Sequence, residues 1–494
     1  MKVLSLLLIL ALASMESFAQ NDSTRVEIPI RPNQSRPMVI PMDEMGFVVI
    51  DQNQANILEP SNVISLTGYD TSMKRKWDQV ITYGRRLSLQ LYEYQAGKLY
   101  LIYGNQQREE REFYVIDPKT GRVDQYDFFY LDNLSAKDFV VISQQVYILG
   151  TLKRLPVLLE FDLKTKKVAP FSLAIDAKDV EVLEVISEGE RQVSATISIE
   201  VNKRKQLLTK TFDIITKEGQ EFVVKPSDEY DLLNGKVTSL NEHDKLVIGT
   251  YGFRNRLESQ GMFVGGYVGG REVIKKYHRF TEMNNFFGFL SENEQQRIAN
   301  KISKKSKKGK ELKLRYRLLV HEAIVHNDEY IMLGEAYYPT YRTERYRRYG
   351  PRGYYYDTRT VFDGYKFTHA VVAAINKRGD LSWDNSFKIN DTKTFQLKER
   401  VKLLVKEETL TLIYNIEGEV YQLQIKNGKE IEGTRSDLLA KKHDHDRVKL
   451  SDTGDAEYWY DNNFLVWGYQ KIKNYEGEGD KIKRNVFYIN KLSY

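Results

Sequence analysis

Histidine and glutamate side chains near the middle of the chain are spaced almost as zinc ligands. His321 and His326 flank Glu322, but hydrolases with this type of zinc site place their two histidines four residues apart on one helical face. The stretches 316–325 and 330–338 are rich in strand-forming residues and predict a β-hairpin. Because the odd spacing of the two histidines puts them on opposite faces of a strand, we expect no metal site here.

Other residue types that support catalysis lack the spacing it requires. His443 and His445 alternate with Asp444 and Asp446 after two lysines, where we expect a surface loop. The chain has no cysteine, nucleophile elbow, phosphate-binding loop or dinucleotide-binding turn, and the glycines between residues 265 and 270 predict only a hairpin tip. Paired carboxylates can hydrolyse a glycosidic bond, but no pair stands out. We therefore expect no cofactor, no metal and no assigned catalytic residue.

The segment 338–364 differs from the rest of the chain because it is dominated by tyrosine and arginine. Tyrosine offers flat apolar area with a hydroxyl, while arginine pairs with carboxylate or phosphate and stacks on rings. This mixture suits an anionic glycan, a lipid head group or an acidic protein surface; a self-packed, solvated loop is the alternative. We expect a long loop whose binding residues are Tyr341, Arg342, Arg345, Tyr346, Arg347, Arg348, Tyr349, Arg352, Tyr354, Tyr355 and Tyr356.

One helix is expected, within an insertion at about residues 284–312. Ser291 and Glu294 have the spacing of a capping box, and Ile298 and Ile302 follow with a four-residue apolar spacing. These signals predict a helix over about residues 292–305, with Gly309 as its stop. Its final turns carry several lysines, which suit the negative end of the helix dipole and predict a solvated face.

The elements around these segments are predicted to be strands. Runs of about five to nine residues rich in Tyr, Phe, Val, Ile, Leu and Thr alternate with Gly, Asn, Asp and Lys clusters. Several runs end on Asp or Asn followed by a short polar turn, in which the side chain can cap backbone amides. These endings are Asp70, Asp117, Asp162, Asp213, Asn376 and Asn490; Trp77-Asp78 and Trp383-Asp384 follow two of them seven residues later.

The early endings recur about every 45 to 50 residues, which is the length of a four-stranded propeller blade. We expect an all-β propeller of about seven, or else eight, blades over residues 46–494, in which the Asp or Asn turn joins the outer two strands of a blade. We expect residues 20–45 to be an extended N-terminal segment. Residues 486–489 should share a blade with residues 47–50 and close the ring, which removes exposed sheet edges. Two β-sandwich domains are the alternative fold.

The first residues predict export. Lys2 precedes an apolar stretch at residues 3–13, and small residues at the recognition positions predict signal-peptidase cleavage between Ala19 and Gln20. Glu16 makes the apolar stretch too short for a membrane span. With no cysteine for acylation or disulfides, we expect a soluble protein of a bacterial periplasm or exterior. The net charge of +6 is too small an excess for us to expect nucleic acid as a partner.

The export signal, the Asp turns and the Trp-Asp pairs together resemble the secreted β-propeller-like proteins of Gram-negative bacteria. Neither the Gly-His partner of WD40 repeats nor the Asp box of sialidases is present, so the resemblance carries over no catalytic residue. We expect a non-enzymatic binding or scaffold protein of the cell envelope that uses its Tyr/Arg loop to bind a macromolecule or protein partner. Peripheral contact with an anionic membrane and glycan hydrolysis by carboxylates near the propeller axis are the alternatives.

Overall fold

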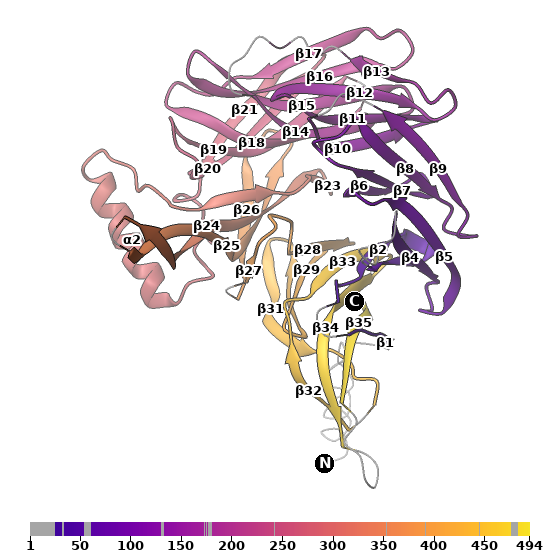
Figure 1. Ribbon diagram of the computed structural model, residues 1–494. Helices are drawn as coiled ribbons and strands as arrows, with labels where there is room; N and C mark the ends of the chain where they lie inside the picture. The colour runs from indigo at the N-terminus through magenta and orange to yellow at the C-terminus, as the bar shows by residue number, and fades with distance from the viewer. Residues whose placement is uncertain are drawn as a thin grey trace, which may run out of the picture.

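The chain folds into a ring of small antiparallel sheets (Figure 1). The computed structural model describes residues 25–31, 34–53, 61–129, 133–171, 173, 175, 180–241, 243–351, 353–390, 392–443, 445–475 and 483–494. Over these residues the strands form eight sheets, and the first strands of most neighbouring sheets contact each other around a central axis. Radially arranged sheets of this kind are the blades of a propeller, so the predicted all-β propeller is confirmed, with eight blades.

The first five blades follow the chain from inner to outer strand. The first two contain β2 (Met38–Pro41), β3 (Phe47–Asn53), β4 (Ser61–Tyr69) and β5 (Arg75–Gly84), then β6 (Ser88–Gln95), β7 (Lys98–Gly104), β8 (Glu110–Ile116) and β9 (Val123–Phe129). The next three contain β10 (Leu134–Ile142), β11 (Gln145–Leu152), β12 (Leu155–Asp162) and β13 (Val168–Phe171), then β14 (Val180–Glu188), β15 (Gln192–Val201), β16 (Arg204–Asp213) and β17 (Gly219–Val224), then β18 (Tyr230–Ser239), β19 (Asp244–Phe253), β20 (Gly261–Val268) and β21 (Arg271–Arg279).

The last three blades are less regular. The sixth contains β22 (Arg317–Val320), β23 (Ile324–His326), β24 (Glu329–Gly350), β25 (Gly353–Asn376), β26 (Leu381–Lys388) and β27 (Lys393–Thr394), and the seventh contains β28 (Lys402–Lys406), β29 (Thr409–Ile416), β30 (Glu419–Lys426) and β31 (Lys429–Leu438). The eighth combines β32 (Asp446–Ser451), β33 (Asp455–Tyr460), β34 (Asn463–Asn474) and β35 (Lys483–Ser493) with β1 (Arg25–Pro29). A short 3-10 helix, η1 (Asp43–Met45), joins β2 and β3.

Asp and Asn residues cap the outer turns of five blades, as the repeat predicts. Asp117 Oδ1 accepts hydrogen bonds from the backbone N–H groups two and three residues further on, at 2.8 and 3.1 Å. These bonds replace backbone partners that a tight turn cannot supply. The same kind of capping recurs between the third and fourth strands of other blades at Asp70, Asp162, Asp213 and Asn376.

The remaining blades show why the repeat alone did not settle the blade count. The outer turn of the fifth blade uses Gly269 and Gly270, with φ of 54° and 78°, and that of the seventh uses Asn427 and Gly428, with φ of 49° and 74°. Paired positive φ values make the type I′ turns that connect strands without a capping Asp. Asn490, expected in a turn, instead lies inside β35 and accepts a hydrogen bond from Arg25 Nη1 at 3.2 Å.

Ring closure differs from the expectation. The last long strand, β35, pairs antiparallel with β1, with Arg25 opposite Asn490 and Pro29 opposite Val486. The expected pairing with residues 47–50 is therefore wrong, because these residues belong to β3 in the middle of the first blade. Within residues 20–45, expected as an extended N-terminal segment, β1 belongs to the eighth blade and β2 to the first. The predicted signal peptide, with its cleavage site at Ala19 and Gln20, lies outside the described residues.

The tryptophans of the two Trp-Asp pairs pack against the outer turn of the next blade. The indole of Trp77 on β5 donates to Pro118 O at 2.8 Å in the outer turn of the next blade. A Cβ atom at Gly121 would come within 2.6 Å of this ring, so the turn needs a bare backbone there. Trp383 on β26 packs in the same way against Gly428 of the seventh blade, where a Cβ would lie 2.5 Å away. The recurrence of tryptophan therefore has a packing cause.

The insertion before β22 contains the expected helix, α2 (Glu292–Ser306). The Glu294 carboxylate accepts hydrogen bonds from the backbone N–H and the hydroxyl of Ser291, at 3.1 and 2.6 Å, which completes the predicted capping box. Gly309 follows with φ of 62°. No residue of α2 is buried, so its lysines form the solvated face that was predicted.

The Tyr/Arg-rich segment is not a loop, and this part of the prediction is wrong. Strands β24 and β25 continue outward from the sixth blade as a paired ribbon, with register from Tyr341 opposite Phe362 to Gly350 opposite Gly353. We call residues 341–362 of this ribbon the hairpin arm. Tyrosine and threonine favour strand geometry. In the ladder, the backbone N–H and C=O groups of the two strands bond to each other, whereas in a loop they would have to bond to water. Figure 1 shows the arm on the same side of the ring as α2.

Candidate functional site

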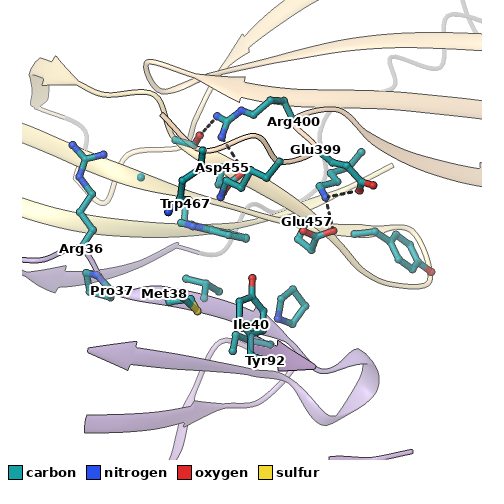
Figure 2. A pocket seen from close by; sticks show the side chains of 18 of the residues that line it. Arg36, Pro37, Met38, Ile40, Tyr92, Glu399, Arg400, Asp455, Glu457 and Trp467 are labelled. Carbon is teal, nitrogen blue, oxygen red and sulfur yellow. Dashed lines mark hydrogen bonds and ion pairs between the residues drawn. The ribbon is translucent and has the colours of Figure 1, made fainter. Parts of the chain in front are cut away.

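A cavity of about 1200 Å³ opens beside the propeller axis. One side, which we call the apolar wall, is formed by strands β2 and β6 and includes Met38, Ile40, Leu89, Tyr92 and Tyr94; Tyr92 is exposed to the cavity, whereas Ile40 is buried in the core of the first two blades. The opposite side, the charged wall, comes from β28, β33 and the segment before β28 and consists of Lys398, Glu399, Arg400, Lys402, Asp455 and Glu457. Figure 2 shows Met38, Ile40 and Tyr92 facing Glu399, Arg400, Asp455 and Glu457 across the cavity.

Some carboxylates near the axis hold blades together and are not free for chemistry. Asp138 Oδ2 accepts a hydrogen bond from Val185 N of the next blade at 2.9 Å, and Glu184 Oε1 accepts one from Val237 N at 2.8 Å. Glu335, which is fully buried, accepts one from Val401 N at 2.9 Å. Because a buried carboxylate needs such partners, these three side chains have a structural role.

The charged wall is a network of internal ion pairs. Lys402 Nζ lies 3.0 Å from Glu457 and 3.6 Å from Glu399. Arg400 Nη1 lies 3.4 Å from Asp455, which also pairs with Lys398. Burial opposes the charge of Lys402, but the two carboxylates outweigh it and raise its pKa. The wall therefore presents fixed donors and acceptors with little uncompensated charge.

Glu93 on β6 is different, because no cation pairs with it among the described residues. Enclosure in the cavity, together with repulsion from Asp138 and Glu322, raises the pKa of Glu93 to about 7. Burial and the neighbouring Glu184 also raise the pKa of Glu322. At neutral pH a substantial fraction of Glu93 is thus protonated, so its carboxyl group can donate as well as accept a hydrogen bond.

Glu93→Gln is expected to stabilise the protein at pH 8 but not at pH 4.5. The native-state pKa of about 7 lies above the ordinary value of 4.5, so the native state binds more protons between these pH values and loses stability as the pH rises through them. Allowing for the solvent in the cavity, we expect a gain of about 1 kcal/mol at pH 8. Urea unfolding at the two pH values measures it; a variant that is less stable than the wild type at pH 8 would contradict the assignment.

The hairpin arm has two different faces, because side chains alternate along each strand. On one, the paired face, Glu344 lies 2.7 Å from Arg342 and 3.0 Å from Arg359. Arg348 on the same face lies 3.5 Å from Asp357. Each arginine of this face therefore has a carboxylate partner, with Glu344 shared by Arg342 and Arg359.

The other, the open face, keeps its positive charge. Arg345 lies over the ring of Tyr356 at 4.2 Å and Arg347 over the ring of Tyr354 at 3.8 Å. In the part of the chain that the structure describes, no carboxylate pairs with either arginine. The exposed fractions of Tyr349 and Tyr354 are 75% and 65%. The open face comprises Tyr341, Arg345, Arg347, Tyr349, Tyr354, Tyr356 and Phe362.

The structure thus divides the predicted binding residues. Six of them lie on the open face, whereas Arg342, Tyr346, Arg348 and Tyr355 lie on the paired face, and Arg352 is outside the described residues. The division follows the odd and even positions of residues 341–349, a signal that is readable only once the segment is recognised as a strand. The axial residues Glu93 and Lys402 were not predicted from the sequence, because they belong to blades that are far apart along the chain.

The histidines noted in the sequence do not come together. His321 Nε2 lies 2.8 Å from Glu335 in the wall of the sixth blade, while His326 Nε2 contacts Asn327 at the hairpin turn. His443 and His445 precede β32, and Asp444 lies outside the described residues. Within the described ranges no group of three or more His, Cys, Asp or Glu side chains is arranged to hold a metal ion. No helix in those ranges is long and apolar enough to cross a membrane.

Comparison with known proteins does not narrow the function. No family model matches the chain, and no curated protein matches it. Among solved structures, the polysaccharide lyase Uly1 is 9% identical with a TM-score of 0.41, covering 95% of this chain and 99% of its own. The Nup133 β-propeller domain of Vanderwaltozyma polyspora is 10% identical with a TM-score of 0.40, covering 93% and 100%. The β-propeller domain of the Trilobed protease from Pyrococcus furiosus is 10% identical with a TM-score of 0.36, covering 80% and 97%.

Proposed function

We propose that the protein is an exported binding or scaffold protein of the bacterial cell envelope that recognises an anionic glycan through the open face of its hairpin arm. The observation that carries the proposal is the contrast between the two faces: Arg345 and Arg347 lie over tyrosine rings, while the arginines opposite are ion-paired. A sugar ring can stack on exposed tyrosine, and the acidic group of the sugar can accept hydrogen bonds from the unpaired N–H groups of arginine.

The geometry of the arm favours a glycan over the two other predicted partners, a lipid head group and an acidic protein surface. The aromatic rings of Tyr349 and Tyr354 lie 5.1 Å apart at the arm's end. Those of Tyr341 and Phe362 lie 6.0 Å apart, nearer the propeller. A row of aromatic rings with two arginines between them matches a polymer of flat, regularly spaced acidic units. The rigid ladder lowers the ordering cost of binding, since the backbone is already fixed.

The test compares two double substitutions that remove the same charge from opposite faces. Arg345→Ala with Arg347→Ala should weaken binding to alginate oligomers at least tenfold, measured by calorimetry at low salt. Arg342→Ala with Arg348→Ala on the paired face should change it less than threefold, because those arginines already have carboxylate partners. Equal losses in the two variants would overturn the role of the open face.

Two further probes separate the ligand classes. Vesicles of anionic phospholipid and polyglutamate carry similar charge without sugar rings, so both should bind more weakly than alginate at equal ionic strength. Tighter binding to either would replace the glycan with a membrane or an acidic protein. Export is tested by sequencing the N-terminus of the protein recovered from the periplasm of a bacterial host, which should begin at Gln20.

Hydrolysis of a glycan is the second candidate function, favoured by the carboxylates gathered around the axis. Glu93, with its raised pKa of about 7, supplies a protonated carboxyl group, and Asp455 on the opposite wall is ion-paired with Lys398 and Arg400. A protonated and an ionised carboxyl group are the pair that glycoside hydrolysis requires. New reducing ends released from a glycan panel, and lost in Glu93→Gln, would support turnover; a panel left intact would contradict it.

A further inference from the structure

The axial cavity combines an apolar wall with a charged wall, and this combination points to a ligand class. The side chain of Tyr92 is 44% exposed although it lines the interior of the ring, and Tyr458 at the cavity edge is 40% exposed. Trp467 on β34 also lines the cavity and is half-buried. Exposed aromatic rings inside a cavity offer flat surfaces with no protein partner on one side.

The charged wall selects against charged ligands. Asp455 is held by Lys398 and Arg400, and Lys402 lies between Glu399 and Glu457. An anionic ligand would compete with these carboxylates for the cations, and a cationic ligand would compete with the cations for the carboxylates. Hydroxyl groups need no such exchange, since they donate to carboxylates and accept from ammonium and guanidinium groups at once.

The size of the cavity and the partial protonation of the Glu93 carboxyl group both agree with a hydroxyl-rich ligand. A cavity of about 1200 Å³ exceeds the roughly 300–1,000 Å³ typical of small-molecule sites and has room for a short oligomer. Glu93 has no cation to neutralise it among the described residues, and its carboxyl group can both donate to and accept from a hydroxyl near neutral pH.

From this geometry we propose that the axial cavity is a second binding site, for an uncharged oligosaccharide whose rings lie on the apolar wall and whose hydroxyls bind the charged wall. The site is separate from the hairpin arm, and it requires neither the arm's ligand nor any turnover. It goes beyond the proposed function by adding a neutral glycan to the anionic one. If the test of one site contradicts its proposal, the proposal for the other site is unaffected.

The experiment measures binding of the full chain to neutral oligosaccharides of four to six units: cello-, xylo-, malto- and chito-oligosaccharides. We expect at least one to bind with Kd below about 1 mM. Tyr92→Ala on the apolar wall and Lys402→Met on the charged wall should each weaken it at least tenfold. Tyr349→Ala, which removes an exposed ring of the arm, is the matched control and should change it less than twofold.

Loss of folding is distinguished from loss of the site by two measurements. Near-UV circular dichroism reports packing of each variant, and Tyr92→Phe should retain binding within threefold because it keeps the ring. Alginate binding through the arm should survive Tyr92→Ala unchanged. The proposal is overturned if no oligosaccharide of the panel binds, or if Tyr92→Ala binds as tightly as the wild type.

Discussion

Arg484→Ala should lower the free energy of unfolding by about 3–5 kcal/mol, because it leaves the buried carboxylate of Asp446 without its cation. Arg484 on β35 lies 3.0 Å from Glu27 of β1 and donates to Asp446 of β32 at 2.8 Å. The side chains of Glu27 and Asp446 are only 4% and 0% exposed. Arg484 thus joins three strands of the eighth blade, while Arg25 on β1 still pairs with Glu27 at 2.9 Å in its absence.

Urea unfolding measures this loss, and the control is Lys483→Ala, which removes the neighbouring exposed cation and should change stability by less than about 0.5 kcal/mol. Adding Asp446→Asn to Arg484→Ala should recover part of the loss, since a buried amide costs less than a buried carboxylate. Hydrogen bonds from Arg484 lower the pKa of Asp446 to about 2. Its stabilisation is therefore present above pH 4 and disappears as the pH falls toward 2. Equal effects of the two alanine substitutions would contradict this role.

The same strand marks the limit of sequence-based prediction of the fold. The Asx turns at Asp117 and Asp162 were predictable because their bonds are local, within three residues of the chain. The pairing of β1 with β35 was not, because Arg25 meets Asn490 from the opposite end of the sequence. Asn427-Gly428 carries a different local signal, that of a type I′ hairpin, and therefore does not share the Asp endings of the other blades.

The candidate sites divide along the same line. The composition of the arm identified a binding segment, and six of its eleven predicted residues lie on the open face. Its two faces could not be assigned while the segment was taken for a loop. For the ring centre, the sequence predicted only that carboxylates gather near the propeller axis. Tyr92 and Lys402 contribute to the axial cavity from the second and seventh blades, and only the closed ring brings them together.

His369 makes the sixth blade sensitive to acid. Its ring is fully buried and stacks on Phe289 at 3.7 Å, with the edges of Phe286 and Tyr316 around it. Its Nδ1 lies 3.0 Å from Thr368 Oγ1. Burial lowers the pKa of His369 to about 3, since no carboxylate in the described part of the chain offsets the loss of water. The three aromatic rings belong to the segment that carries α2, so this histidine packs the insertion onto the propeller.

His369→Phe should therefore reduce the acid sensitivity of the protein. In the wild type the unfolded state binds one more proton than the native state between about pH 6.5 and 3, so stability falls as the pH falls through this window, by about 1.4 kcal/mol per pH unit. The variant should lose about 2–3 kcal/mol less than the wild type between pH 7 and pH 4.5 in urea unfolding. Phenylalanine preserves the stacking on Phe289, and the Thr368 hydroxyl keeps Ala336 O as a partner at 3.3 Å. His326→Gln, at a hairpin turn, controls for the loss of one histidine. Identical pH profiles of His369→Phe and the wild type would show that His369 is not the group that senses acid.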